Sequence, residues 1–182
     1  MKWIKLFEEF RYEQMNQKSL PSVDEIVIRD IQVIRGKNRW SETRTQLIQM
    51  VLDLGDWEEF PSDKIPFFSE RLKEFLPSLW VHRCSIGIEG GFFQRVDDGT
   101  WLGHIIEHIA LEIQTLAGMD VGWGRTRGVT GEVGVYNVVF NYLDEEVGVK
   151  AAKESVRIAK DLINGIDPKI EETVLKLRTL ST

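Results

Sequence analysis

Two of the three histidines lie four residues apart, within residues 103–108 (GHIIEH). On an α-helix this spacing puts both side chains on one face, about 40° apart around the axis. Two imidazoles placed in this way can bind one divalent metal ion. Glu107 lies one turn after His104 and next to His108, on the same side of the helix. The segment is therefore a candidate metal site with a carboxylate beside it.

The order His-x-x-Glu-His is that of the inverzincin class of zinc peptidases. In such sites three protein ligands leave one position of the metal open for water, whose pKa falls toward ~7. A carboxylate that is not a ligand then takes the proton of the water and passes it to the leaving amine. This is the role predicted for Glu107. The pattern fixes only three letters, so the alternative is that His104 and His108 are ordinary helix histidines.

A third ligand is required, and the candidates are Cys84, His82, Glu89 and Glu112. Zinc prefers thiolate and imidazole, which ranks Cys84 first. If residues 81–84 are extended, His82 and Cys84 point to the same face, and His82 would be a ligand or would support one. The alternative for a lone cysteine is an inert, buried apolar side chain.

The motif must be positioned by a helix, because apolar residues recur at helical spacing over residues 101–116. Thr100 suits the N-cap and Gly118 suits the position just past the C-terminus, so we predict a helix between them. We expect the apolar side of this helix to pack in the core. Both histidines and Glu107 should then lie beside the core rather than in it.

The remaining elements follow from periodicity and from the positions of glycine and proline. Helices are predicted over 1–15, 67–76, 151–163 and 170–180, and strands over 26–28, 31–34 and 133–142. Residues 41–52 have an ambiguous period that fits a helix or a strand. Two segments are predicted as glycine-containing loops, 84–91 with short strand-like flanks and 118–134.

Strands and helices do not alternate regularly, which predicts an α+β fold: a mainly antiparallel sheet packed against helices in a single domain. We divide the chain into an N-terminal amphipathic extension (1–25), a central domain (26–165) and a C-terminal helix or linker (166–182).

The composition of the 182 residues, 42% apolar and 29% charged, is typical of a folded globular protein. A net charge of −6 argues against nucleic-acid binding through a basic face. No apolar run reaches the ~18 residues needed to span a bilayer, and the N-terminus has no small-residue cleavage site of a secretory signal. We therefore expect a cytoplasmic protein that binds neither nucleic acid nor membrane.

Several blocks of the sequence occur together in one known family. They are residues 31–36, 38–41, 76–79, 84–85, 90–92, 103–112, 117–119, 121–127 and 135–140. In this order, from about residue 26 to about residue 165, the chain closely resembles the N-terminal domain of cyanophycin synthetases.

The resemblance implies an α+β domain that helps to hold cyanophycin, a poly-aspartate chain with arginine attached to each side-chain carboxylate. In some members it also implies a metallopeptidase-like zinc site that cuts cyanophycin into primers. Glu107 would then be catalytic, and His104, His108 and Cys84 would be the metal ligands. The ATP-grasp and Mur-ligase-like parts that add Asp and Arg have no counterpart in these 182 residues, so no ligase activity is expected from this chain alone.

Each cyanophycin repeat presents a carboxylate and a guanidinium. Arg95, Arg125 and Arg127 could pair with the carboxylates, and Glu89 or Glu112 could receive the guanidinium. Solvated surface charges or local salt bridges are the alternative for each of these side chains.

Three functions are compatible with this sequence. The first is a zinc-dependent hydrolase that cuts the cyanophycin backbone into primers. The second is a non-catalytic polymer-binding module of a synthetase with a vestigial site. In the third, residues 1–25 mediate assembly into a homo-oligomer.

Overall fold

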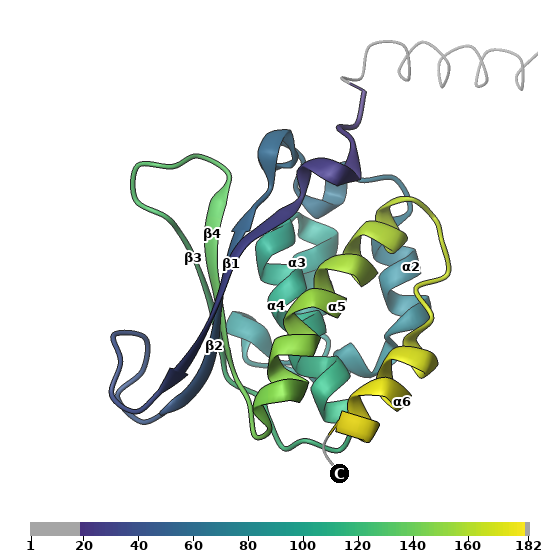
Figure 1. Ribbon diagram of the computed structural model, residues 1–182. Helices are drawn as coiled ribbons and strands as arrows, with labels where there is room; N and C mark the ends of the chain where they lie inside the picture. Colours follow the sequence, from purple (N-terminus) through teal and green to yellow (C-terminus); the bar gives the residue numbers. More distant parts are fainter. Residues whose placement is uncertain (1–18, 181–182) are drawn as a thin grey trace, which may run out of the picture.

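The computed structural model describes residues 19–180 (Figure 1). Four antiparallel strands form one sheet in the order β1-β2-β4-β3, with the helices on one side of it. The strands are β1 (Val27–Arg35), β2 (Gln46–Asp53), β3 (Gly124–Gly128) and β4 (Val135–Asn141). The helices are α2 (Phe68–Phe75), α3 (Gly91–Asp98), α4 (Leu102–Leu116), α5 (Glu145–Ile163) and α6 (Ile170–Leu180). This confirms the predicted α+β fold with a mainly antiparallel sheet in a single domain.

Short 3-10 turns complete the described chain: η1 (Val23–Glu25), η2 (Gly55–Glu59), η3 (Ser62–Lys64), η4 (Pro77–Val81) and η5 (Cys84–Ile86). The amphipathic helix predicted over 1–15 lies outside the described residues. Within residues 19–180, no helix combines the length and the apolar character needed to cross a membrane.

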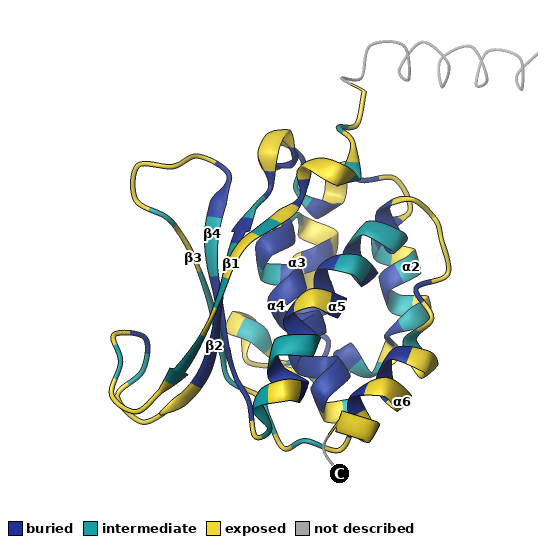
Figure 2. Ribbon diagram, viewed as in Figure 1, coloured by how far each residue is buried: buried dark blue, intermediate teal, exposed yellow. Residues whose placement is uncertain are grey.

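The core lies between the sheet and the helices. Ile48, Met50 and Leu52 alternate along β2 and are fully buried, and Val138 and Phe140 of β4 lie opposite them on the same face. Helix α4 packs on β3 and β4, α5 packs on β1 and β2, and the two helices pack against each other. Almost all of α4 is buried as a result (Figure 2).

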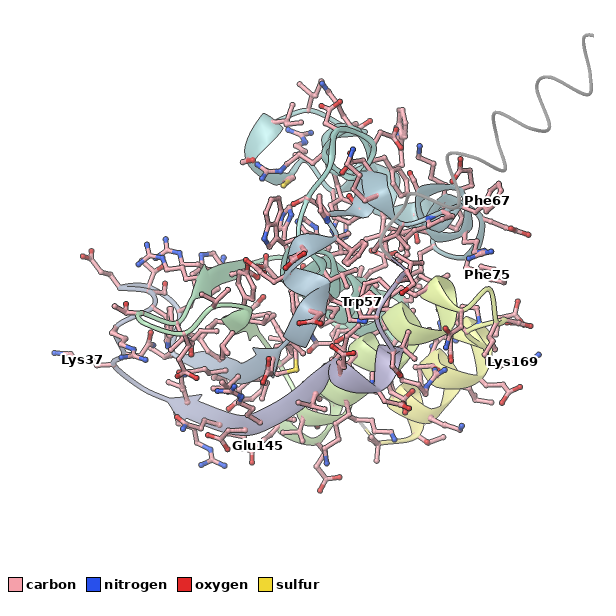
Figure 3. All side chains as sticks on the ribbon, turned by 90° about the horizontal axis from the view of Figure 1, so that it is seen from above. Lys37, Trp57, Phe67, Phe75, Glu145 and Lys169 are labelled. Carbon is pink, nitrogen blue, oxygen red and sulfur yellow. The ribbon has the colours of Figure 1, made fainter. Side chains whose placement is uncertain are left out.

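Most large apolar side chains lie in this interior, and most charged side chains lie at the surface of the molecule. Trp57 of η2 lies inside the body, whereas Lys37, Glu145 and Lys169 point outward (Figure 3). The indole N–H of Trp57 donates a hydrogen bond to the backbone oxygen of Ser22, which satisfies the one polar atom of this buried ring.

Within the ambiguous segment 41–52, the structure has strand β2 from Gln46 onward, whereas residues 41–45 belong to no helix or strand. Both faces of β2 carry buried apolar residues. On the face away from the helices, Leu47 packs against Trp40 and Val139. Apolar residues on both faces hide the alternation that marks a half-exposed strand. The two predicted strands at 26–28 and 31–34 are one strand, β1, with an irregularity between Ile28 and Asp30.

Both segments predicted as loops contain regular structure. Residues 84–91 have no strand-like flanks: they hold η5 and lead into α3, which the sequence did not predict. Within 118–134, residues 124–128 form β3, paired with β4. Tertiary pairing overrides the low strand propensity of this glycine-rich edge.

Candidate metal centre

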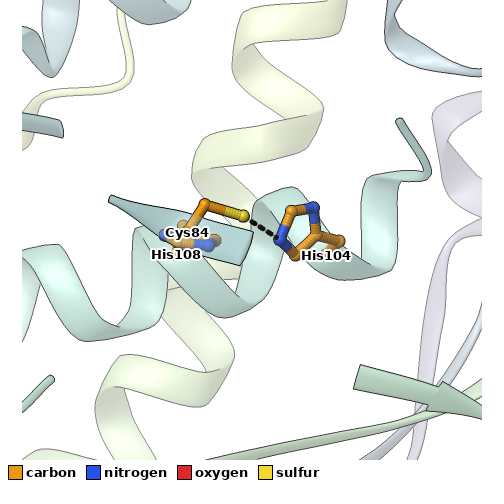
Figure 4. Close-up of side chains that lie close together, drawn as sticks. All are labelled: Cys84, His104 and His108. Atoms are coloured by element: carbon orange, nitrogen blue, oxygen red, sulfur yellow. Dashed lines mark hydrogen bonds between the residues drawn. The ribbon is translucent and has the colours of Figure 1, made fainter. Parts of the chain in front are cut away.

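Helix α4 places His104 and His108 one turn apart, with their ring centroids 4.8 Å from each other and their planes at 85°. The turn η5 brings Cys84 to the same point, where its Sγ lies 3.2 Å from Nε2 of His104 (Figure 4). One ligand atom from each of the three residues lies within 4.8 Å of the other two. Residues twenty positions apart in the sequence thus meet at one candidate centre.

The backbone of Cys84 is unusual. Its φ of +50° is in the left-handed region, which costs free energy for a residue with a Cβ. The loop that follows is tightly packed, since a Cβ added at Gly91 would lie 2.8 Å from the backbone oxygen of Arg83. The surrounding fold therefore holds Cys84 in a conformation that an isolated peptide would avoid.

Thr100 orients the first histidine. Its hydroxyl lies 3.1 Å from Nδ1 of His104, so that Nε2 faces the sulfur of Cys84. We predicted Thr100 as the N-cap of the helix, and this was wrong. The N-cap is Trp101, without a side-chain capping bond, and α4 begins at Leu102. The hydroxyl contacts His104 instead.

His82 contacts His108, the second histidine of the motif, at the ring nitrogen Nδ1. Its Nδ1 lies 2.9 Å from Nδ1 of His108, and its Nε2 lies 2.8 Å from Oε2 of Glu112. Ser78 donates a hydrogen bond to the other oxygen of Glu112. The ring of Phe92 stacks on His108 at 4.2 Å between centroids. These contacts occupy Nδ1 of His108 and leave Nε2 available as a ligand atom.

The four candidates for a third ligand therefore lie in different places, and only one of them is at the metal centre. Within residues 19–180, only Cys84 is grouped with His104 and His108. His82 and Glu112 form a hydrogen-bonded pair behind His108. Glu89 is exposed, and its Oε1 lies 3.9 Å from Nη2 of Arg83.

Glu107 lines the same cavity but lies outside the group of three. Its side chain is 5% exposed, and this burial raises its pKa to about 7. The hydroxyl of Thr126 donates to Oε2 at 2.6 Å, and this bond and the charge of Arg125 partly oppose the rise. A carboxyl group with a pKa near neutrality can both accept and release a proton at physiological pH.

The two histidines of the motif are neutral at pH 7. Burial, followed by the positive charge of Arg95, lowers the pKa of His104 to about 4. Burial also lowers the pKa of His108 well below its usual value, with further contributions from His104 and His82. Neutral imidazole is the form that binds a metal ion. Burial opposes ionisation of Glu112, yet the bonds from His82 and Ser78 keep its pKa low.

This donor set fits zinc. Two neutral imidazoles and one thiol are ligands that zinc prefers, and Zn–N and Zn–S bonds of about 2.0–2.3 Å put tetrahedral ligand atoms roughly 3.5 Å apart. The separation of 3.2 Å between Cys84 Sγ and His104 Nε2 is close to that value. Three protein ligands would leave one position for water.

The centre lies in a cavity of about 1060 Å³ between η4, η5, α4 and β3. Arg95 and Arg125, two of the residues predicted to bind substrate, line it. Arg95 donates to the hydroxyl of Ser85, and Arg125 donates to the backbone oxygen of Trp40. Arg127 and Glu89 are exposed, and neither lines this cavity.

Two residues that the sequence did not predict position Glu107. Thr126 is its hydrogen-bond partner, and Gly124 lies so close that an added Cβ would be 2.5 Å from Oε1 of Glu107. Both belong to β3, the strand that was predicted as a loop. The only sign of a strand in the sequence is that Thr126 stands between Arg125 and Arg127. This pattern does not predict the hydrogen bond between Thr126 and Glu107, because that bond depends on the pairing of β3 with β4.

The model of the cyanophycin synthase-like N-terminal domain family matches residues 49–164. Curated cyanophycin synthetases are similar to the chain. The protein from Geminocystis herdmanii is 54% identical over 132 residues, 72% of this chain and 15% of its own length. That from Trichormus variabilis is 52% identical over 142 residues (78% and 16%), and that from Synechocystis sp. is 48% identical over 147 residues (81% and 17%). The chain thus spans less than a fifth of the length of these relatives.

Proposed function

Because the chain belongs to the family of cyanophycin synthase-like N-terminal domains, we propose that it binds cyanophycin and hydrolyses its backbone with a zinc ion held by Cys84, His104 and His108. The shorter chains produced would serve as primers. The observation that carries the proposal is the convergence of a thiol and two neutral imidazoles in a cavity that also contains Glu107.

A bound zinc ion would supply a Lewis acid and a water molecule of lowered pKa. The ligands would be Sγ of Cys84, Nε2 of His104 and Nε2 of His108, since Nδ1 of each histidine faces another side chain. With His108 bound through Nε2, its Nδ1–H donates to His82, and Nε2–H of His82 donates to Glu112. This chain of bonds fixes the orientation of the His108 ring.

Glu107 would act as the proton carrier. Thr126 occupies Oε2, which leaves Oε1 to take the proton of the attacking water. The remaining hydroxyl group would bond to the carbonyl carbon of the backbone amide, the C–N bond would break, and Glu107 would pass the proton from Oε1 to the leaving amine. One water is consumed, and one new carboxyl and one new amino terminus are formed. A pKa of about 7 suits both halves of this transfer.

The experiment that tests this proposal is Glu107→Gln in the zinc-loaded chain. The amide cannot carry the proton, so the rate at which cyanophycin is shortened should fall by about 10²–10⁴-fold while zinc content is unchanged. Chain length is measured by electrophoresis of the polymer and zinc by elemental analysis. Glu171→Gln, an exposed acid of α6, is the matched control and should cut at the wild-type rate.

Two outcomes would contradict the proposal. Persisting cleavage in Glu107→Gln would remove Glu107 as the proton carrier. Protein without zinc that never shortens the polymer, but still binds it after His104→Ala, would instead identify a non-catalytic polymer-binding module.

A further inference from the structure

The Glu58 carboxylate is held by two aromatic side chains that line the cavity. The indole N–H of Trp101 donates to Oε1 of Glu58 at 2.9 Å. The hydroxyl of Tyr136 lies 2.8 Å from Oε1 and 2.7 Å from Oε2 of the same carboxylate. Trp101 and Tyr136 both line the cavity that contains the metal centre. Two uncharged donors from separate elements therefore fix the position of Glu58.

The negative charge of Glu58 is not compensated by a cation within residues 19–180, where every ion pair involves other acids. Burial and the nearby carboxylate raise the pKa of Tyr136, so its hydroxyl keeps its proton at neutral pH. An anion that is held in place without a cationic partner can receive a cation from a ligand.

The surroundings favour a flat organic cation over a metal ion. Trp101 is 40% exposed, so part of its indole surface is open to a ligand, and indole faces attract cations. The two donors supply two hydrogens, whereas an ionised carboxylate has about four acceptor positions. The positions left over suit the paired N–H groups of a guanidinium.

We propose that Glu58, Trp101 and Tyr136 form a guanidinium subsite that receives an arginyl side chain of the bound polymer. This inference rests on the proposed function for the identity of the polymer. The subsite borders the metal centre: the Tyr136 ring packs against Gly103, where an added Cβ would lie 3.4 Å from its Cγ, and Gly103 directly precedes His104. An arginine held there would position the neighbouring backbone amide next to the metal-binding turn.

Glu58 replaces the two acids that the sequence suggested for this role. Glu112 is already bonded to His82 and Ser78. Glu89 is exposed, and its Oε1 lies 3.9 Å from Nη2 of Arg83, so its charge already has a cationic neighbour. Among these three acids, Glu58 alone combines a fixed position, an unpaired charge and neighbours that line the cavity.

The test measures binding without turnover, in the Glu107→Gln chain, by titration calorimetry. The probes are a short aspartyl-arginine oligomer and the same oligomer with citrulline, whose neutral urea group has almost the shape of guanidinium. The parent should bind the arginine form about tenfold more tightly, as expected for one charged hydrogen-bonded pair. Adding Glu58→Gln should remove this preference, and adding Glu171→Gln should preserve it.

Tyr136→Phe keeps the ring but frees the carboxylate, so it should reduce the preference even if Glu58→Gln fails to fold, which thermal unfolding would reveal. An unchanged preference in a folded Glu58→Gln or Tyr136→Phe chain would overturn the subsite. A wild-type chain that prefers arginine but never cuts the polymer would overturn the hydrolase and leave the subsite standing.

Discussion

At the scale of single residues, each imidazole of the motif has its Nδ1 engaged by another side chain: Thr100 for His104 and His82 for His108. Nε2 of His104 then faces Sγ of Cys84, and Nε2 of His108 is left available as a ligand atom. Partners of this kind fix the ring orientation of metal-binding histidines. The candidate centre therefore depends on residues from three separate segments, of which only one carries the motif.

Gly124 provides a test of how closely Glu107 must be positioned. In Gly124→Ala the new methyl group would meet Oε1 of Glu107 at 2.5 Å, so the carboxylate must move. We expect cleavage to fall by about 100-fold and the free energy of unfolding to fall by about 1–3 kcal/mol. Cleavage rates and urea unfolding measure the two effects.

The matched control is Gly122→Ala, because no atom lies within 4 Å of a Cβ added there. This variant should cut and unfold like the wild type. Full cleavage by Gly124→Ala would mean that the observed position of Glu107 is not required for the reaction.

The spacing along one helix predicted His104, Glu107 and His108, because periodicity alone determines which residues share a helix face. Cys84 was ranked from zinc chemistry, not from geometry. Thr100 was assigned the wrong role, because a threonine before a helix has two possible partners and only the fold selects one. Glu58 was not predicted, since no local pattern connects η2 to the two rings that hold it.

At the scale of elements, the strongly periodic segments within residues 19–180 were predicted well, except that α5 begins at Glu145 and not at residue 151; the short, polar ones were not. Helix α4 ends as expected, with Gly118 in the left-handed region at φ +102°. Strand β3 has no apolar alternation, so only its pairing with β4 defines it. The N-cap of helix α3 is Gly90, which has a left-handed backbone conformation and no side chain to cap the helix. The Ser, Thr, Asp or Asn that usually marks the start of a helix is therefore missing.

Helices α5 and α6 are joined by a charged cluster. Arg157 of α5 binds Glu154 and Asp161 and donates to the backbone oxygen of Pro168 and to Thr173, at the start of α6. Lys150 also pairs with Glu154. Burial acts to raise the pKa of Glu154, but the hydrogen bonds from Lys150 and Arg157 outweigh it, and the pKa is lowered.

This lowered pKa predicts a pH-dependent contribution to stability. An acid whose pKa is lower in the folded state stabilises the fold above its unfolded pKa and loses that contribution as pH falls through the folded value. Glu154→Gln should therefore lower the free energy of unfolding by about 0.5–1 kcal/mol at pH 7. The difference from wild type should shrink as pH falls below the usual glutamate value of 4.5.

Denaturant unfolding at several pH values checks this, with Glu171→Gln as the exposed control that should show little difference at any pH. A difference that is constant from pH 7 down to acid would show that the ionised form of Glu154 contributes nothing specific.

At the scale of the whole molecule, the sheet provides β3, the helical layer provides α4, and the turns between them provide Cys84 and Glu58. The cavity lies where these parts meet. Arg95 and Arg125 line it, and the Glu58 carboxylate is bonded to two residues that line it, Trp101 and Tyr136. Charges of both signs around one cavity suit a polymer whose repeats carry both a carboxylate and a guanidinium. The chain spans 15–17% of the length of its curated relatives.

The most direct measurement follows the length of cyanophycin chains during incubation with the protein, first as purified, then after removal of metal by a chelator, and then after one equivalent of zinc is restored. We predict that the chains shorten, that shortening stops when the metal is removed, and that it resumes with zinc. Shortening that continues at full rate in the metal-free protein would contradict a hydrolytic centre built on Cys84, His104 and His108.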